Sequence, residues 1–538
     1  MRCKRRWRLW ALSSPRRLNW AAALLEGGVA PAGSPAAAGE LRCCCAATFA
    51  SCALAAASAG WNMDGPPRLD ASSTFLVWRD PVEAWEENWT FVVLQLAMFA
   101  LATATLVHAI RVGRAGLLLW LAAVGHGLFV EGFCYALPEL DNFHHGRALV
   151  AIFGGRMPGY VVVLYPAFYY SAAQLASMLL GGLGSQFSGL RALGRRRREA
   201  SSEGVVDVEL VATAALTGLL TALVDVPYDA MGPKLLHWSW HPDDPNVFER
   251  TGPFIPTTSF IFHITFAASW LLVGAAASRV ARMPCCGKLG WIPALLVASL
   301  LPFPLGVMQI QLFYVVPHDL ACVPTATCLA AAVGAYLVVI VLCAWWLRGG
   351  VTRRVDPSIR RVSALPVLAL LSVFSCCFVA FAALADPAGL SDTGVHLPVA
   401  VSEEACSRTE TMLSLGGVAT KSMHLCSLPD GASSGGPLAL RPGDRSSFPL
   451  VGHTLPAAHC AMPEVPHPFR VANSASEAQA GVIRKWTMIG TEWGAEGPAS
   501  TRAAMLMVVC WPVALMLTTV LAAWSLDRSP SLAHSKSD

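Results

Sequence analysis

The chain has 538 residues, of which 54% are hydrophobic and only 14% are charged, and its formal net charge at pH 7 is +4. Soluble domains contain about 25% charged residues, so this composition excludes a water-soluble globular enzyme, and its hydrophobicity excludes a disordered chain. The small net charge excludes the basic surface of a nucleic-acid-binding protein, and we expect no nucleic-acid partner. The composition predicts an all-α, polytopic membrane protein.

The N-terminal segment, residues 1–60, is predicted to be a targeting sequence. Its first 25 residues are rich in Arg, no acidic residue precedes Glu26, and the apolar stretch 43–59 ends in small residues. This pattern resembles a secretory signal with a cleavage site. An uncleaved anchor and an organelle transit peptide are the alternatives. The target membrane is therefore expected to belong to the secretory pathway or to a plastid.

Nine stretches are long and apolar enough to span a bilayer core of about 30 Å, which takes about 20 residues per helix. They predict eight spans within residues 61–384 and a last span with a short tail within residues 502–538. The predicted spans are 90–110, 115–136, 158–182, 206–226, 255–280, 291–315, 323–347, 363–384 and 502–524.

Basic residues alternate between the short loops that join these spans. The loops after the first, third, fifth and seventh spans are rich in Arg, including the run 195–198, whereas the other loops contain only Arg147, Arg156, Lys234 and Arg250. Cytosolic loops are the ones that carry an excess of Lys and Arg. The pattern predicts that the N-terminus lies outside the cytosol and the C-terminus inside it.

Residues 385–501 form the one long loop, and the predicted orientation places it on the extracytosolic side. The loop is rich in Gly, Ser and Pro, and it shows no helical or strand periodicity over a long window. Its three cysteines, Cys406, Cys426 and Cys460, allow one disulfide and leave one thiol over. We interpret it as a weakly ordered loop, with a ligand-binding lid as the alternative.

Two local patterns suggest covalent modification. Cys285 and Cys286 follow the fifth span on the predicted cytosolic side, where cysteines can carry palmitate. Alternatively, they serve only as small apolar residues. The glycosylation pattern that begins at Asn88 lies almost at the bilayer, where a glycan would be crowded, so we expect it to stay unmodified.

Ionisable groups are costly inside a bilayer and usually face the bundle interior, so they are the first candidates for a site. Most of them gather between the second and sixth spans, on the predicted extracytosolic side. The candidate acids are Glu131, Asp225 and Asp229, with Tyr135 and Tyr228 beside them, and the candidate substrate-binding residues are His126, Trp238, Trp240 and His263.

Two of the segments involved resemble each other. Each has a carboxylate at the outer end of a span, a tyrosine three or four residues later and then a histidine, Glu131 leading to His144 and Asp225 to His237. This similarity suggests a duplicated hairpin made of spans two and three and of spans four and five. Repeats of this kind place a site at their interface.

Three interpretations of the cluster stay open. The carboxylates and tyrosines can form an acid–base site that acts on a lipid-soluble substrate. Histidines can instead form a metal site, since His237 and His241 are four residues apart and Asp141, His144, His145 and His263 could supply further ligands. In the structural alternative, these polar residues only cap helices, form ion pairs and anchor the protein at the membrane surface.

Residues 224–232, Val-Asp-Val-Pro-Tyr-Asp-Ala-Met-Gly, and residues 234–241, Lys-Leu-Leu-His-Trp-Ser-Trp-His, carry a family resemblance. They resemble an uncharacterised family of eukaryotic multi-pass membrane proteins from algae, oomycetes and other protists. This resemblance implies a membrane-embedded fold and no particular reaction.

A second pattern resembles the carotenoid-biosynthesis membrane proteins that hydrate carotenoid end groups. The residues that match it are Glu131, Asp225, Asp229, Trp238, Trp240 and Pro256. The chain departs from this pattern at Ala230, where the family has proline, and at Ser259, where it has asparagine. The resemblance implies that water adds to an isoprenoid double bond after a carboxylic acid protonates it.

The sequence thus predicts a membrane protein that binds or modifies a lipid-like molecule, for which an isoprenoid is one candidate. The site is expected on the extracytosolic side of the second, fourth and fifth spans. A non-enzymatic transporter or receptor-like protein is the alternative, and a metal-dependent oxidoreductase is the third. The expected partners are the lipid bilayer and a lipophilic small molecule, and the sequence names no cofactor.

Overall fold

The computed structural model describes residues 75–136, 143–153, 155–186, 208–240, 250–251, 255–281, 290–321, 323–348 and 357–386, with short stretches between 390 and 521. All of them belong to the second of two compact units, Pro66–Asp538. The predictions for residues 1–60, for His241 and for Cys285 and Cys286 fall outside the described residues.

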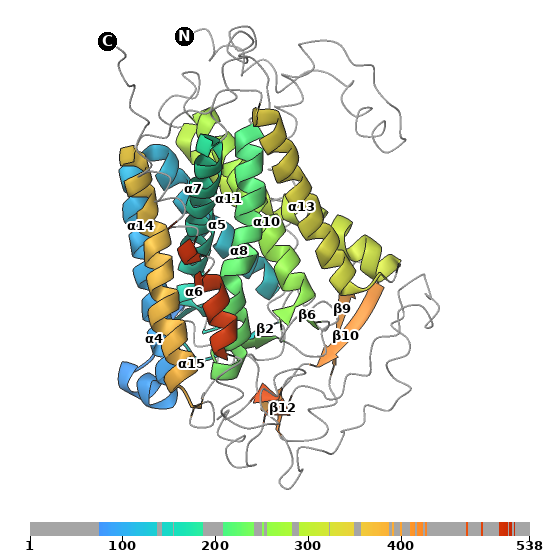
Figure 1. Ribbon diagram of the computed structural model, residues 1–538. Coiled ribbons are helices and arrows are strands. Elements are labelled where there is room, and N and C mark those ends of the chain that lie inside the picture. The colour runs from blue at the N-terminus through green and yellow to red at the C-terminus, as the bar shows by residue number, and fades with distance from the viewer. Residues whose placement is uncertain are drawn as a thin grey trace, which may run out of the picture. The chain divides into compact units, whose positions relative to one another are not determined.

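Helices dominate the described part of the chain, in agreement with the predicted fold class (Figure 1). The helical elements are α4 (Pro81–Val112), α5 (Arg114–Ala136), α6 (Gly159–Tyr165), η2 (Pro166–Tyr170), α7 (Ser171–Gln186), α8 (Val208–Met231), η5 (Pro233–Leu235), α10 (Thr257–Ala281), α11 (Trp291–Leu300), α12 (Pro302–Ile310), η8 (Gln311–Leu320), α13 (Thr325–Arg348), α14 (Pro357–Val373), η9 (Phe374–Phe378) and α15 (Val379–Leu384).

Among the described residues, seven helical stretches are long and apolar enough to cross a membrane, which indicates a multi-pass membrane protein. They are Pro81–Val112, Arg114–Tyr135, Val208–Leu235, Thr257–Ala281, Trp291–His318, Thr325–Trp346 and Ala364–Leu384. Each coincides with one predicted span. The third predicted span corresponds to α6, η2 and α7, and the last one contains a shorter apolar helix, Met505–Thr518. The count of nine spans and their orientation stay predictions.

The core of the bundle forms around α8 and α10. Helix α10 packs against α8, α5, α11 and α12, while α8 also contacts α7 and α13, and α14 packs against α4 (Figure 1). Trp270 on α10 is completely buried. The close approach of α8 to α10 depends on Gly218, because a Cβ at this position would overlap the carbonyl oxygen of Ile264.

Gly218→Ala is expected to destabilise the protein by about 1–3 kcal/mol, the usual cost of forcing an extra group into a packed core. The obstacle is backbone, so the two helices must separate to admit the methyl group. Titration with SDS in mixed micelles measures the change in unfolding free energy. Gly334→Ala on α13 is the matched control, because nothing lies within 4 Å of its new Cβ. That substitution is expected to be neutral or slightly stabilising.

Helix α4 begins earlier than hydropathy predicts, because its first turn is polar. The Asp80 side chain accepts hydrogen bonds from the backbone N–H groups of Val82 (2.7 Å) and Glu83 (3.3 Å), and Pro81 occupies the first turn. This is a standard helix start. At Asn88 the backbone leaves helical geometry (φ −150°, ψ 79°), and Asn88 Oδ1 accepts from the Phe91 N–H (3.1 Å), which restarts the helix.

Two prolines shape the helices that contribute to the candidate site. Pro166 follows α6, and the chain passes it through the π-helical turn η2, an arrangement that is frequent at functional sites. Pro227 lies inside α8, which extends beyond the predicted end at residue 226. Asp225 and Asp229 therefore lie on one helix, one turn apart, and share a face.

The strands are short and lie at the ends of the helices or in the 385–501 segment. The segments predicted to be similar meet in one of these pairs, because β2 (Phe143–His145) pairs antiparallel with β5 (Trp238–Trp240). The remaining strands are β1 (Leu76–Trp78), β3 (Val150–Ile152), β4 (Met157–Pro158), β6 (Arg250–Thr251), β7 (Ile255–Pro256), β8 (Val399–Ala400), β9 (Thr409–Ser414), β10 (Gly417–Ser422), β11 (Leu425–Ser427), β12 (Arg470–Val471) and β13 (Trp486–Thr487).

These strands form small sheets that the sequence did not predict. Strand β3 joins β1 to β4, β6 pairs with β7, and β9 and β10 form a hairpin with Thr411 opposite Thr420. Strands β13, β12, β11 and β8 lie in that order in a further, mixed sheet. The segment 385–501 thus contains strands where its composition indicated only a loop.

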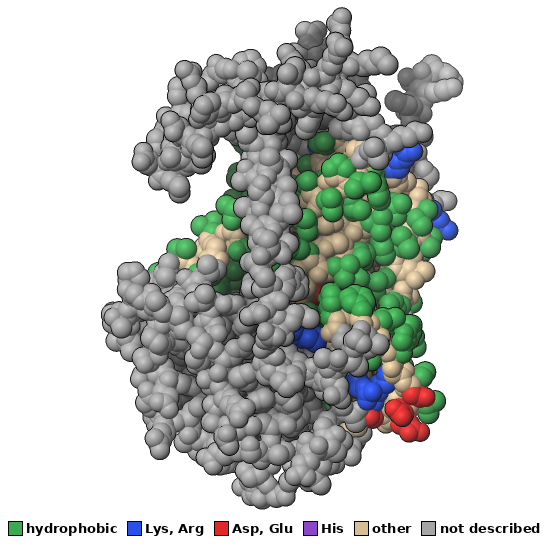
Figure 2. Space-filling model, turned by 180° about the vertical axis from the view of Figure 1, so that it is seen from behind, with side chains coloured by type: hydrophobic (Ala, Val, Ile, Leu, Met, Phe, Trp, Pro, Cys, Tyr) green, Lys and Arg blue, Asp and Glu red, His purple; other side chains and the backbone are tan. Residues whose placement is uncertain are grey.

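The outer surface of the helices suits contact with lipid. Figure 2 shows hydrophobic side chains over much of one helical face, with charged side chains toward its ends. Helix α13 is also strongly apolar outside, and its exposed hydrophobic residues are Leu337, Val338, Val341, Leu342, Trp345 and Trp346. An apolar surface of this extent is typical of membrane-embedded helices.

Candidate functional site

Four ionisable side chains from three helices define what we call the carboxylate site: Glu131 of α5, Asp225 and Asp229 of α8, and His263 of α10. The three carboxylates are buried. One ligand atom each of Asp225, Asp229 and His263 lies within 4.8 Å of the others. All four residues were candidates in the sequence, His263 as a substrate-binding residue, and the structure brings them together.

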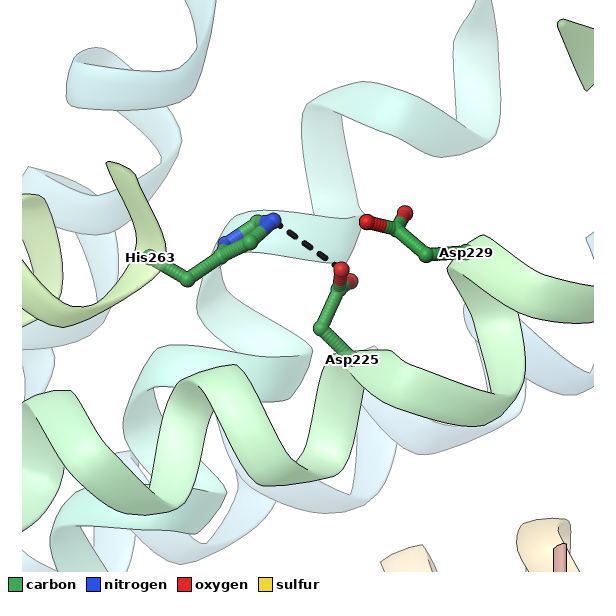
Figure 3. Close-up of side chains that lie close together, drawn as sticks. All are labelled: Asp225, Asp229 and His263. Atoms are coloured by element: carbon green, nitrogen blue, oxygen red, sulfur yellow. Dashed lines mark ion pairs between the residues drawn. The ribbon is translucent and has the colours of Figure 1, made fainter. Parts of the chain in front are cut away.

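Helices α8 and α10 each present two polar residues one turn apart. His263 Nε2 lies 3.0 Å from Asp225 Oδ2 (Figure 3). One turn away, the Ser259 hydroxyl donates a hydrogen bond to Asp229 Oδ2 at 2.6 Å. The side chain of Asp225 is 3% exposed and that of His263 is 19% exposed, so the imidazole forms the accessible edge of the pair.

Glu131 is held by one of its two oxygens. The Tyr165 hydroxyl donates to Glu131 Oε1 at 2.8 Å, while Oε2 is buried and accepts no hydrogen bond. Glu131 lies close enough to His263 for their charges to interact. One carboxylate oxygen is therefore fixed, and the other is available to a proton or a ligand.

Two tyrosines from the third predicted span border the carboxylate site, and the sequence had not singled them out. Besides Tyr165, the buried Tyr169 has a hydroxyl without a hydrogen-bond partner, and this residue interacts electrostatically with both Asp225 and Glu131. Both tyrosines flank Pro166 in the sequence. The sequence offered one sign of these tyrosines. A proline within an apolar span predicts an interruption of the helix, and Pro166 lies between them.

His126 packs behind these tyrosines. Its ring contacts Tyr165, Tyr169 and Phe266 at centroid distances of 6.0, 6.2 and 5.7 Å, and Nδ1 lies 3.2 Å from the carbonyl oxygen of Ser299. His126 Nε2 is buried without a hydrogen-bond partner. The residue thus contacts the site through aromatic rings.

The predicted tryptophans form an aromatic layer at the end of α8. Trp238 stacks on Tyr228 at 5.6 Å and meets Trp240 edge to face at 4.3 Å. The Tyr228 hydroxyl lies 2.7 Å from that of Tyr160. The Tyr135 ring contacts that of Phe143 at 6.0 Å, and the Arg156 guanidinium sits 4.8 Å above it.

The predicted histidine metal set is not assembled among the described residues. The group of three or more possible ligands found there is Asp225, Asp229 and His263, and neither His145 nor His237 belongs to it. The His145 ring is buried 5.1 Å from that of Phe143. His144 lies in β2, and His241 lies outside the described residues.

His237 instead joins α4 to the end of α8. Its Nε2 lies 2.8 Å from Thr90 Oγ1, and its ring stacks on that of Phe91 at 5.1 Å. Its backbone N–H donates a hydrogen bond to the Gly232 carbonyl at 2.9 Å. Its own carbonyl accepts from the Gly146 N–H at 2.9 Å. These contacts assign His237 a structural role in this part of the bundle.

Burial lowers the pKa of His237 from 6.5 to about 3, because the imidazolium loses its hydration. Between these values the unfolded chain binds a proton that the folded chain does not, so stability falls as pH decreases below 6.5. The loss is about 1.4 kcal/mol per pH unit. SDS unfolding at pH 7 and pH 5 is expected to show this loss in the wild type. His237→Gln, whose amide can still bond to Thr90, is expected to show a shallower slope; equal slopes would contradict the assignment.

The fold and the site together define a multi-pass helical membrane protein with buried carboxylates among its spans. The chain belongs to the family described as Domain of unknown function (DUF7802), which matches residues 73–181 and 205–430 and includes the entire carboxylate site. No curated protein and no solved structure matches the chain. The predicted membership of a family without a known function is thus confirmed, while the resemblance to carotenoid-hydrating proteins stays a prediction.

Proposed function

We propose that this membrane protein binds a lipid-like molecule at the carboxylate site and modifies it by acid–base chemistry. An isoprenoid is the leading substrate class, in keeping with the sequence resemblance to carotenoid-hydrating proteins. With nine spans and the orientation given by the loop charges, the site lies on the extracytosolic side. The alternation of Arg-rich loops supports that orientation.

The observation that carries the proposal is the convergence of three carboxylates and one imidazole within an apolar helical bundle. Charges are costly there, and ionisable residues inside membrane spans are therefore the first candidates for a functional site. A single imidazole cannot neutralise three ionised carboxylates. The cluster is therefore suited to hold a proton and to release it to a substrate.

Glu131 is the best placed acid in this proposal. The hydrogen bond from Tyr165 occupies Oε1 and leaves Oε2 to carry the proton. Transfer of that proton to an alkene carbon leaves a carbocation, which the faces of Tyr169 and neighbouring rings stabilise. A water molecule then adds its oxygen to the cation, and Glu131 takes back the proton that the water loses, which regenerates the acid. The net change is addition of one water.

Access from the lipid side is supported by the surroundings of Glu131. A Cβ at Gly132 would meet no atom within 4 Å, so open space lies beside the backbone next to this acid. The partial exposure of His263 supports a second point of access. An apolar molecule could thus approach the carboxylate site without crossing the core of the bundle.

Mass spectrometry of lipids extracted from the protein purified in mild detergent tests the proposal. The wild type is expected to retain one lipid class above background, and Gly132→Leu, which fills the open space, is expected to lose it. Gly334→Leu is the control, because it adds the same side chain to α13, where the glycine also has open space. Equal retention by both variants would contradict binding beside Glu131. No retained lipid in the wild type would favour the transporter or receptor-like function.

A further inference from the structure

We propose that Asp225, Asp229 and His263 bind a divalent first-row transition-metal ion. This site shares only His263 with the metal site considered from the sequence, whose other possible ligands were Asp141, His144, His145, His237 and His241. The role of the ion rests on the proposed function, because the ion would be a cofactor of the same carboxylate site. Binding of the ion can nevertheless be measured independently of any lipid.

The ligand atoms already lie near the spacing that an ion requires. Two ligands that are each about 2.1 Å from an ion and at right angles to each other lie about 3 Å apart. His263 Nε2 and Asp225 Oδ2 are 3.0 Å apart, and all three ligand atoms lie within 4.8 Å of one another. Binding of the ion requires the Asp229 carboxylate to turn toward the other two ligands.

The local structure orients these ligands. Asp225 and Asp229 are one turn apart on α8 and lie on one face, opposite His263 of α10 (Figure 3). The Ser259 hydroxyl donates a hydrogen bond to Asp229 Oδ2 at 2.6 Å, so Oδ1 is the oxygen that would bind the ion. Hydrogen-bonded carboxylates of this kind are typical of metal sites, where residues outside the ligand set hold the ligands in place.

The charge of the cluster also favours a cation. Asp225 and Asp229 are both buried, and two neighbouring carboxylates in an apolar interior repel each other. One imidazole can neutralise only one of them, and only when it is protonated. A divalent ion neutralises both and uses the imidazole in its neutral form, which is the form that binds metals.

Two buried groups beside the cluster point to a ligand independently of these three residues. Glu131 Oε2 and the Tyr169 hydroxyl are both buried without a hydrogen-bond partner. Glu131 interacts electrostatically with His263, and Tyr169 interacts with Asp225. A metal-bound water would give both groups the partner that buried polar atoms normally have. Three protein ligands with an open position for water are typical of catalytic metal sites.

The ligand set selects the class of metal. Carboxylate oxygens with one imidazole suit Zn²⁺, Mn²⁺ and Fe²⁺, whereas Mg²⁺ and Ca²⁺ prefer oxygen ligands alone. We therefore use Zn²⁺ and Mn²⁺ as probes. Elemental analysis of the full-length protein in detergent and calorimetric titration of the chelator-treated protein measure metal content and affinity.

The wild type is expected to bind about one ion per chain, as a single site requires. The double variant D225N/D229N is expected to lose this binding. Its control is Glu209→Gln, an exposed carboxylate at the start of α8, which should bind metal like the wild type. Ser259→Ala is expected to weaken affinity about 10-fold or more, the usual effect of removing a residue that orients a ligand.

Zn²⁺-dependent thermal stabilisation separates lost binding from lost folding, because each variant is compared with itself with and without the ion. The wild type and Glu209→Gln are expected to gain stability, whereas D225N/D229N should unfold cooperatively and gain none. Absence of metal binding in the wild type, or unchanged binding in D225N/D229N, would overturn the inference. If the wild type retains a lipid but binds no metal, the proposed function holds and this inference fails. If it binds metal but retains no lipid, this inference holds and the proposed lipid binding fails.

Discussion

Replacing Glu131 with glutamine is expected to lower the ratio of hydrated to unmodified lipid by about 10²–10⁴-fold, the usual contribution of a general acid. Glutamine keeps the size of the side chain, and its amide oxygen can still accept the hydrogen bond from Tyr165. It has no proton that it can transfer to an alkene. Binding should survive while turnover is lost, and mass spectrometry separates the two lipids because they differ by one water.

Glu209→Gln provides the control for the glutamine substitution, because this carboxylate is exposed and far from Glu131 in the chain. Tyr165→Phe is expected to lower the ratio less, since it removes the hydrogen bond to Oε1 but leaves the acid. A ratio that is unchanged in Glu131→Gln, with lipid still bound, would show that Glu131 is not the acid.

Replacing Asn88 with alanine is expected to have the largest effect on stability. Asn88 Nδ2 donates to the Leu235 carbonyl at 2.6 Å, and Oδ1 accepts from the Thr90 hydroxyl at 2.6 Å and from the Phe91 N–H at 3.1 Å. The substitution leaves the Leu235 carbonyl and the Phe91 N–H without these partners. The expected loss is about 2–6 kcal/mol, because each buried unsatisfied group costs about 1–3 kcal/mol.

Thr103→Ala on the same helix is the control, because the Thr103 hydroxyl donates to the Phe99 carbonyl at an exposed position. Its effect on the unfolding free energy should stay within about 0.5 kcal/mol, as for most surface substitutions. SDS titration measures both variants. A loss in Asn88→Ala no larger than that in Thr103→Ala would contradict the role given to Asn88.

The start of α4 shows what hydropathy can and cannot predict. The apolar stretch from residue 90 was recognised, whereas the turn before it contains Glu83, Glu86 and Glu87 and therefore fell outside the window. Asp80 and Pro81 were the sequence signs of the earlier start. The buried position of Asn88 also supports the expectation that its glycosylation pattern stays unmodified.

The ionisable members of the site could be predicted because charge stands out in an apolar span. Glu131, Asp225 and Asp229 interrupt stretches of Leu, Val and Ala, and the structure brings them together. Ser259 and Tyr169 could not be found in this way, because neutral side chains do not stand out from the apolar residues of a span as charged ones do. The π-helical turn at Pro166 also shifts the register in which the tyrosines face the bundle, so a regular helical period does not place them.

His237 makes a contact that its local sequence does not indicate. Its spacing from His241 suggested two metal ligands, which stays a prediction because His241 lies outside the described residues, and the residues between them form strand β5. The partner of His237 is Thr90, which lies 147 residues earlier. A contact between residues so far apart in the sequence leaves no local pattern from which it can be predicted.

A cryo-EM structure of the protein extracted with its native lipids shows whether the carboxylate site binds a ligand. We expect non-protein density within hydrogen-bond distance of Glu131 Oε2, about 3 Å, and bordered by α5 and α10. The part of this density that belongs to a lipid should be absent in Gly132→Leu. A wild-type map without such density, in which the carboxylates contact only one another and neighbouring side chains, would contradict ligand binding at this site.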